Sequence, residues 1–476
     1  MSNTAQSKAA ERIAALLDEN SFVEIGAAVK ARSTDFNLTD AKTPSDGVIT
    51  GYGLIDDSLV YVYSQDASVL GGSLGEMHAK KIARLYDLAM KMGAPVIGLI
   101  DCAGLRLQES TDALNAFSVL YAKMAAASGV IPQISAVLGK CGGGLAVLAG
   151  MSDFVYMEEK NAKLFVNAPN ALLGNKTEDT AAADFQSRHT GLADFVGTEE
   201  EILSQIRSLV SILPANNEDG APLEETEDDL NRVSADLAGA FGDPAFVLSQ
   251  ISDDSLYIEV KAACAPEMVT AFVKLGGTTV GAVANRTVLY DEKGEKKSEF
   301  KPLLTAKGCE KAAKFVRCCD AVDIPVLTLT NAEGVLADRH NEFRIAKSAA
   351  ALTSAFAEAT VAKVNVVTGN AYGSAYSIMN SQGLGADITF AWTGAKIGMM
   401  DAKLAAGIMY GDKSADEQAE MAAQYDEKQQ SAEAAAERGY VDTVIDPADT
   451  RKMVIGALEM LWSKQDDTPA KKHGTV

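Results

Sequence analysis

A run of three glycines, Gly142 to Gly144, offers the clearest chemistry in the sequence. It follows Cys141 and an apolar run, Val130 to Val137, that predicts a buried strand, and small apolar residues then continue to Met151 as a short buried helix. A strand, a glycine turn and a helix start leave backbone N–H groups without acceptors above the turn. Such donors bind a phosphate or the oxyanion of a thioester enolate, although a tight β–α packing turn fits the same residues.

The same arrangement occurs again 230 residues further along the chain. The segment LGKCGGGLA of the first half is matched by TGNAYGSAY in the second, and APVIGLIDCAG is matched by IPVLTLTNAEG. The residues that share this spacing are the pairs Gly51/Gly281, Pro95/Pro325, Gly104/Gly334, Gly139/Gly369, Gly143/Gly373, Lys81/Lys311 and Ala83/Ala313. One constant spacing over so many motif positions predicts a tandem duplication of a single α/β unit.

Strands and helices alternate around the first glycine turn. The expected elements are a hairpin with its bend at Asp56-Asp57, helices over 76–92, 110–127 and 199–212, and strands over 94–100, 130–138 and 154–158. This succession predicts an α/β fold with a largely parallel sheet and crossover helices. Ligands of such sheets lie beyond the carboxyl ends of the strands, which is where both glycine turns would lie.

Length, charge and cysteine usage set the class of protein. A chain of 476 residues, 47% of them hydrophobic, can bury a large core, and its length predicts two domains. A net charge of −22 argues against nucleic acid or an anionic membrane as a general partner. No secretory signal or membrane-length apolar run is apparent, and six cysteines without ligand or disulfide spacing predict reduced thiols in a cytoplasmic protein. Four unclustered histidines give no reason to predict a metal site.

An acidic segment separates the two halves. Pro214 to Asp236 contains eight acidic residues against one arginine, and we interpret it as a solvated linker. We therefore predict two domains, over residues 1–225 and 226–476.

Several longer motifs carry a family resemblance. They are DGVITGYG, SQDASVLGGSLGEMHAKKI, MKMGAPVIGLID, ASGVIPQIS, EATVAKV, AYGSAY, LGADITFAW and AAERGYVDTVIDP. From about Ser21 to Gly474 the chain resembles the carboxyltransferase (β) subunit of biotin-dependent acyl-CoA carboxylases, and it is similar to the α subunits of sodium-pumping acyl-CoA decarboxylases. The resemblance implies a tandem duplication of a crotonase-like (ClpP/crotonase) β-β-α superhelix unit. It also implies a hexamer, a trimer of dimers, with each site formed between two subunits.

The resemblance further implies a division of labour between the halves. The N-terminal half would hold a short-chain acyl-CoA, of the acetyl-, propionyl- or methylmalonyl-CoA type, and the C-terminal half carboxybiotin. An acyl enolate would attack carbon dioxide released from N1 of the biotin. The N–H groups of Gly143 and Gly144 would bind the thioester oxygen, and those of Ser374 and Ala375 the ureido oxygen of biotin. The cofactor carries the difficult chemistry, while the protein supplies orientation and N–H donors.

Other positions are expected to line the two ligand sites by the same resemblance. They are Gly104, Gly142, Gly373, Arg106 and Ser377, of which Ser377 matches a position that helps to choose the acyl group. Arg106 could bind the CoA phosphates or cap a helix, and Lys140 is a weaker candidate for the phosphates. The biotin would be attached to a separate carrier protein. The sequence Ala89 to Met92 imitates a biotinyl-lysine motif, but it ends an amphipathic helix on whose apolar face Met92 is expected to lie.

The chain departs from the family pattern at several turns, and other functions stay open. Ala103 and Leu105 replace a glycine and an alanine, Ser374 replaces a glycine, and the loops over 335–343 and 401–403 differ. The partners could be a biotin carboxylase or the membrane subunits of a decarboxylase, which fixes the direction. The alternatives are a non-catalytic scaffold paralogue of such a complex, and a crotonase-type hydratase or isomerase, for which only Glu109 lies near a glycine turn.

Overall fold

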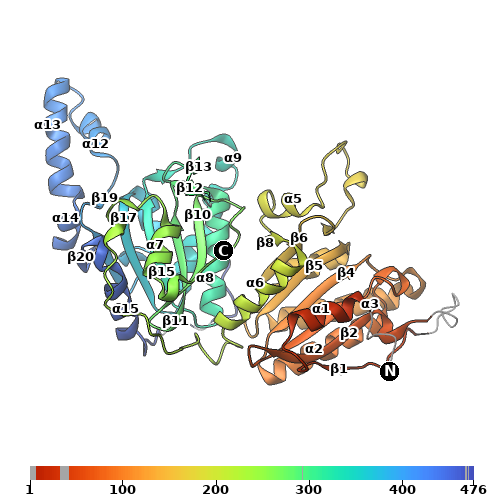
Figure 1. Cartoon of the computed structure of the whole chain (residues 1–476). Helices are drawn as coiled ribbons and strands as arrows, with labels where there is room; N and C mark the ends of the chain where they lie inside the picture. Colours follow the sequence, from red (N-terminus) through yellow and green to blue (C-terminus); the bar gives the residue numbers. More distant parts are fainter. Residues whose placement is uncertain (1–6, 33–41, 292, 467–468, 470) are drawn as a thin grey trace. The chain divides into compact units, whose positions relative to one another are not determined.

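The chain folds into two compact units, Met1–Gly220 and Ala221–Val476, and each is described by itself. The computed structural model describes residues 7–32, 42–291, 293–466, 469 and 471–476 (Figure 1). The second unit begins inside the acidic segment because Leu223 bridges to Thr278, and the N–H of Glu224 donates to the carbonyl of Gly277 at 3.0 Å. The division therefore lies slightly before the boundary predicted after residue 225.

The N-terminal unit is built on one sheet with the strand order β1-β2-β3-β4-β5-β6-β8, and β7 also pairs with β5. The first three strands are antiparallel, and every pairing from β3 onward is parallel. The strands are β1 (Val23–Ile25), β2 (Val48–Ile55), β3 (Ser58–Gln65), β4 (Val96–Cys102), β5 (Gln133–Gly142), β6 (Phe154–Glu158), β7 (Lys163–Phe165) and β8 (Phe195–Gly197).

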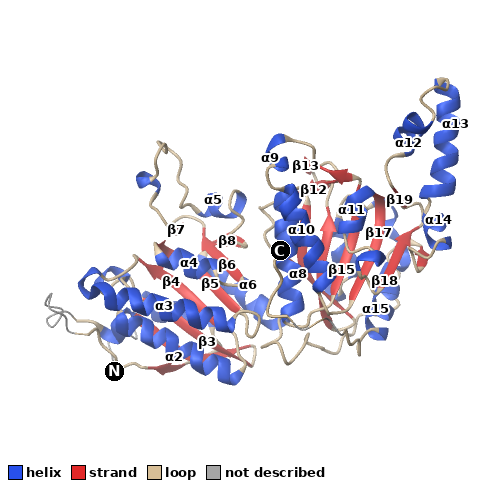
Figure 2. Ribbon diagram, turned by 180° about the vertical axis from the view of Figure 1, so that it is seen from behind, coloured by secondary structure: helices blue, strands red, loops and turns tan. Residues whose placement is uncertain are grey.

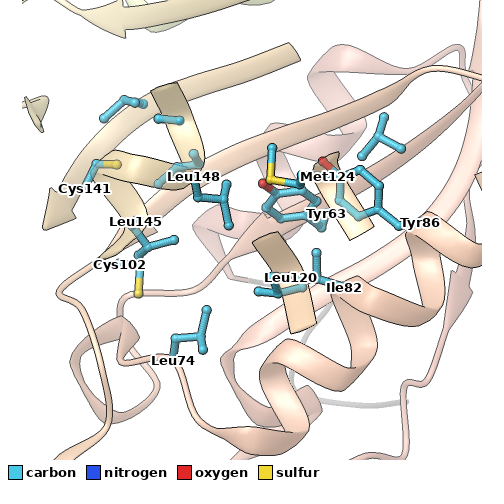
Figure 3. Packing of buried hydrophobic residues seen from close by; sticks show 14 of the residues in the cluster. Tyr63, Leu74, Ile82, Tyr86, Cys102, Leu120, Met124, Cys141, Leu145 and Leu148 are labelled. Atoms are coloured by element: carbon cyan, nitrogen blue, oxygen red, sulfur yellow. The ribbon is translucent and has the colours of Figure 1, made fainter. Parts of the chain in front are cut away.

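Helices of the N-terminal unit bury their apolar faces against this sheet. One core joins Tyr63 of β3 to the helices α2, α3 and α4 (Figure 3). The helices α1 and α6 contact each other and the sheet. The capping box of Thr198 and Glu201 fixes the start of α6. The helices are α1 (Lys8–Leu16), α2 (Glu76–Met92), α3 (Ser110–Ala127), α4 (Gly144–Gly150), α5 (Ala183–Arg188) and α6 (Glu199–Ile212). The expected helices over 76–92, 110–127 and 199–212 are confirmed.

The C-terminal unit repeats this plan with the strand order β20-β18-β17-β15-β11-β10-β9, and β19 pairs with β17 (Figure 2). The strands are β9 (Tyr257–Glu259), β10 (Met268–Leu275), β11 (Thr278–Asn285), β15 (Val326–Ala332), β17 (Lys363–Tyr372), β18 (Ile388–Trp392), β19 (Lys396–Gly398) and β20 (Thr443–Ile445). The helices are α7 (Pro244–Ile251), α8 (Ala306–Ala321), α9 (Arg339–Glu342), α10 (Ile345–Glu358), α11 (Gly373–Ile378), α12 (Ala402–Met409), α13 (Ala415–Tyr425), α14 (Ala432–Glu437) and α15 (Thr450–Met460).

Strand register shows which residues of the two halves correspond. Tyr61 of β3 pairs with Val96 of β4, and Gly281 of β11 pairs with Val326 of β15. Gly281 therefore corresponds to Tyr61, and the predicted pairing with Gly51, which lies on β2, is wrong. The shift arises because a hairpin of β12 (Val288–Tyr290) and β13 (Lys296–Glu299), absent from the described part of the first half, stands between β11 and α8. The constant spacing resumes at α2 and α8, where Lys81 and Lys311 are both buried.

Each half contains an equivalent arginine–aspartate ion pair, which is partly exposed in the first half and buried in the second. In the N-terminal unit Arg207 donates to the carbonyl of Leu16 at 2.8 Å and pairs with Asp18, and these side chains are 28% and 27% exposed. In the C-terminal unit Arg451 donates to the carbonyl of Ile251 at 2.6 Å and pairs with Asp253, and these side chains are 0% and 1% exposed. A buried pair is costly to break because the remaining charge cannot be solvated.

We predict that Arg451→Met lowers the stability of the C-terminal unit by about 3–5 kcal/mol, since it leaves Asp253 buried and unpaired. The matched Arg207→Met should cost only about 0–1 kcal/mol because water screens the exposed pair. Thermal unfolding of the two variants beside the wild type checks this. Equal losses of stability in the two variants would contradict the role assigned to burial.

Candidate active site

The first glycine turn lies at the carboxyl end of β5, beside the end of β4. Their ladder shifts register there: Ile100 faces Val137, but Cys102 faces Cys141, so β5 carries extra residues opposite Asp101. Such a bulge bends a strand and re-aims its end. Beyond it Gly143 has φ +62° and ψ −125°, a conformation that favours glycine. The chain then turns into α4.

The amide of Gly143 is already used within the fold. Its N–H donates to the carbonyl of Phe165, the last residue of β7, at 2.9 Å. The expectation that Gly143 offers a free donor is therefore wrong. Gly144 is the first residue of α4, and an N–H in the first helical turn has no acceptor within its own helix.

A second turn, at Ala103-Gly104, lies against the first. A Cβ on Gly142 would stand 3.4 Å from the carbonyl oxygen of Ala103 and 3.2 Å from the ring of Phe165, so this glycine allows a close approach. Gly104 has φ +119°, and its carbonyl accepts the N–H of Leu74 at 2.8 Å. Ala103 is not among the residues with positive φ, so replacing the family's glycine adds no strain there.

Arg106 lies beneath this turn and does not reach solvent. Its side chain is 0% exposed, and Nη1 lies 2.7 Å from both Asp46 and Glu109, while Nη2 donates to the carbonyl of Ser73. The contact with CoA phosphates suggested from sequence is therefore wrong. Arg106 does occupy the N-cap of the short 3-10 helix Leu107–Glu109, where its carbonyl accepts the N–H of Glu109 at 3.1 Å. Burial raises the pKa of Asp46 even though Arg106 opposes that effect. Lys140, the weaker candidate, is exposed on β5.

A buried histidine extends this polar network toward the strand ends. His78 lies 3.0 Å through Nδ1 from the carbonyl of Asp46 and 3.1 Å through Nε2 from the amide nitrogen of Gln65. An amide nitrogen only donates, so Nε2 accepts, Nδ1–H donates, and the ring is neutral. Burial lowers the pKa of His78 to about 3. Gln65 in turn accepts the N–H of Asp101 at 3.2 Å.

The second glycine turn has a similar form in the C-terminal unit. Gly373 has φ +57°, and a Cβ there would stand 3.1 Å from the carbonyl oxygen of Met399. Ser374 and Ala375 follow in the first turn of α11; Ser374 is exposed and Ala375 is buried. Ser377 lies on the same helix and is also exposed. The predicted C-terminal residues therefore lie together on one short segment.

A cavity of about 550 Å³ lies beside the end of β17. Lys396 and Asp426 form an ion pair in its wall, and Asp401 caps α12 through the amides of Lys403 and Leu404. Burial, with the nearby carboxylates, raises the pKa of Tyr372 to about 12. Sequence reasoning missed this cavity because its wall combines distant segments. It is lined by Asn370, Tyr372, Lys396, Asp401, Ala402, Lys403, Ala415, Gln418, Ala419, Ala422, Ala423 and Asp426.

The two cysteines of the N-terminal turns are buried, and the lysine of the biotin-like motif lies at the end of a helix. Cys102 and Cys141 are both fully buried in the N-terminal core, where burial raises the pKa of the Cys102 thiol to about 12 and raises that of Cys141 also. All six cysteines are free. Lys91 stands in the last turn of α2, and Met92 is 59% exposed, so the expectation of Met92 on the apolar face is wrong. Among the described residues, no group of three potential metal ligands is found.

Comparison with known proteins identifies the family and supports the fold. The family model described as carboxyl transferase domain matches residues 3–476. The chain belongs to the carboxyl transferase family. This carboxyltransferase is 38% identical to the methylmalonyl-CoA decarboxylase subunit alpha of Veillonella parvula, with 98% of this chain and 92% of that protein covered. It is also 38% identical to the propionyl-CoA carboxylase beta chain of Roseobacter denitrificans, with 98% and 93% covered.

A solved structure agrees with these relatives. The transcarboxylase 12S crystal structure, a hexamer with hydrolysed methylmalonyl-coenzyme A bound, aligns with a TM-score of 0.92 at 34% identity, covering 98% of this chain and 92% of that one. The crotonase-like duplicated fold is therefore confirmed, and the chain is a biotin-dependent acyl-CoA carboxyltransferase. In the described parts of this carboxyltransferase, no helix is both long and apolar enough to cross a membrane.

We predict that acid destabilises this carboxyltransferase through His78. The folded pKa of about 3 lies below the ordinary value of 6.5, so the neutral ring contributes stability above pH 6.5 that is lost as the pH falls. At about pH 5 the loss is about 2 kcal/mol relative to neutral pH. His78→Gln keeps a donor and an acceptor without a titrating ring. Melting temperatures measured against pH should therefore fall less steeply in that variant, and parallel curves would contradict the assignment.

Proposed function

We propose that this chain transfers a carboxyl group between N1 of biotin on a separate carrier protein and the α carbon of a short-chain acyl-CoA of the propionyl- or methylmalonyl-CoA type. The observation that carries the proposal is the duplicated strand bulge and glycine turn, found in a chain of this family. The names of the relatives support the choice of acyl group, because they act on propionyl-CoA and methylmalonyl-CoA. The cytoplasm is the proposed location, where six free thiols stay reduced.

The N-terminal unit is proposed to hold the thioester. Gly144 would donate its N–H to the thioester oxygen, and the adjacent Ala103-Gly104 turn would supply the second donor in place of Gly143. These backbone donors lie where negative charge develops as the α carbon loses its proton or its carboxyl group. Each is worth about 3 kcal/mol in the transition state, because it is fixed before the reaction begins.

The C-terminal unit is proposed to hold the biotin, and its residues suit that group. The exposed turn at Ser374 offers amides to a ureido oxygen, while Gly373 and the cavity beside Tyr372 leave room for a bicyclic ring. Biotin, when bound, supplies and accepts the carboxyl group at N1. The amides of Ser374 and Ala375 would hold and orient the ureido oxygen, and Ser377 would face the acyl group.

The proposed oligomeric state rests on the similarity to transcarboxylase 12S. Transcarboxylase 12S is a hexamer, and we propose that this chain also forms a hexamer, a trimer of dimers. Its proposed partners are a biotin carboxyl carrier protein and either a biotin carboxylase or the membrane subunits of a decarboxylase. Genes beside its own distinguish the two directions: a biotin carboxylase indicates carboxylation, and a membrane subunit indicates decarboxylation.

We predict that Gly143→Val lowers carboxyl exchange between free biotin and methylmalonyl-CoA by at least about a hundredfold. The positive φ disfavours valine, and a shift of the turn would move the Gly144 amide away from the thioester oxygen. Gly150→Ala is the matched control because it lies in α4, has no positive φ and meets only Leu192 at 3.9 Å. The assay measures exchange by labelled carboxyl transfer, with assembly checked by size.

The outcomes separate the competing functions. Full exchange in Gly143→Val would contradict the use of this turn. Absence of both turnover and acyl-CoA binding in the wild type, across a panel of acyl-CoAs, would instead indicate the non-catalytic scaffold paralogue.

A further inference from the structure

The residue opposite the strand bulge makes the same hydrogen bond in both halves. In the N-terminal unit the Oδ1 atom of Asp101 accepts the N–H of Lys140 at 3.2 Å. In the C-terminal unit the Oδ1 atom of Asn331 accepts the N–H of Asn370 at 3.2 Å. The bulge removes an ordinary ladder bond, and this side chain satisfies the amide that is left without one.

In both halves a glycine leaves the space that this side chain occupies. A Cβ on Gly139 would stand 2.1 Å from the Oδ1 atom of Asp101, and a Cβ on Gly369 would stand 2.5 Å from that of Asn331. The backbone amides of the two residues also match, since Asp101 donates to Gln65 and Asn331 donates to Asn285. The side chain therefore fixes the path by which the strand enters its glycine turn.

Charge distinguishes the two halves at this position. Asp101 is a carboxylate, and Arg12 of α1 lies 3.3 Å from its Oδ2 atom. Asn331 is a neutral amide and needs no counter-ion. The arginine is 2% exposed, donates through Nη2 to the carbonyl of Leu138 at 3.3 Å, and is held at Nε by Glu199 at 3.0 Å.

The residue that corresponds to Arg12 can be identified independently. The duplicated ion pair places the carbonyls of Leu16 and Ile251 at equivalent positions, because each accepts from the arginine of its pair. Counting back one helical turn from each places Arg12 opposite Val247, a residue of α7 that is 1% exposed. The positions equivalent to Arg12 and Asp101 are thus the uncharged couple Val247 and Asn331.

We propose that Arg12 is a positioning residue for the acyl-CoA half of the reaction. It neutralises Asp101, whose carboxylate fixes the Lys140 amide, and so sets the approach of β5 to Gly142 and Gly144. It touches no substrate. This inference rests on the proposed function for its kinetic consequences, while the effect on the strand itself does not.

The test uses three variants of the whole assembled protein: Arg12→Val, Asp101→Asn and the double variant, which copies the uncharged couple. Arg12→Val leaves a carboxylate without its counter-ion, so kcat/KM for methylmalonyl-CoA should fall by about tenfold or more while KM for free biotin stays within about twofold. The double variant should recover to within about threefold of the wild type. Asp101→Asn alone should change little, because Glu199 still neutralises Arg12.

Hydrogen exchange of backbone amides gives a readout that needs no activity. Exchange over residues 138–142 should rise in Arg12→Val and return to the wild-type level in the double variant. Residues 368–372 serve as the internal control and should not change in any variant. This measurement keeps the inference testable if the wild type proves inactive, which would count against the proposed function alone.

Two results would overturn the inference. One is wild-type kinetics and wild-type exchange in Arg12→Val. The other is a double variant no better than Arg12→Val, because that outcome would make Arg12 a packing residue of α1 and not a partner of Asp101.

Discussion

An unpaired backbone amide at a strand bulge is the constraint on which both candidate sites depend. Each half of this carboxyltransferase bends its central parallel strand to aim a glycine turn, and the bend leaves one N–H without a ladder partner. A side chain from the neighbouring strand satisfies that group, and a glycine beside it admits the side chain. The turn, the short helix after it and the amides proposed to bind oxygen all follow from this local arrangement.

The same fold manages buried charge differently in its two halves. The N-terminal unit places three charged groups beneath its turn, Arg106 with Asp46 and Glu109, and a further pair at Arg12 and Asp101. The C-terminal unit buries other ion pairs, Arg451 with Asp253 and Arg286 with Glu259. Duplicated backbones therefore preserved the hydrogen bonds that shape the turns, while the ion pairs that support them diverged.

Sequence reasoning succeeded where the signal is local or shared with a family. The predicted helix over 199–212 has the bounds of α6, and the motif resemblance identified the fold. It failed where distant segments decide the outcome. The partners of Arg106 include Asp46, sixty residues earlier, and the amide of Gly143 is taken by Phe165 of another strand. The pairing of Gly51 with Gly281 was an accident of spacing that only strand register could reveal.

The two halves can no longer exchange their central strands freely. A copy of β15 moved into the first half would bring Asn331 beside a buried arginine. A copy of β4 moved into the second half would bring in Asp101, where the residue equivalent to Arg12 is the buried Val247. The first transfer is tolerated because Glu199 still neutralises the arginine. The second is compatible only if the helix that begins the first unit moves with the strand. Gene conversion within this chain is therefore constrained in one direction: the second-half strand can replace the first, whereas the first-half strand needs α1 to move with it.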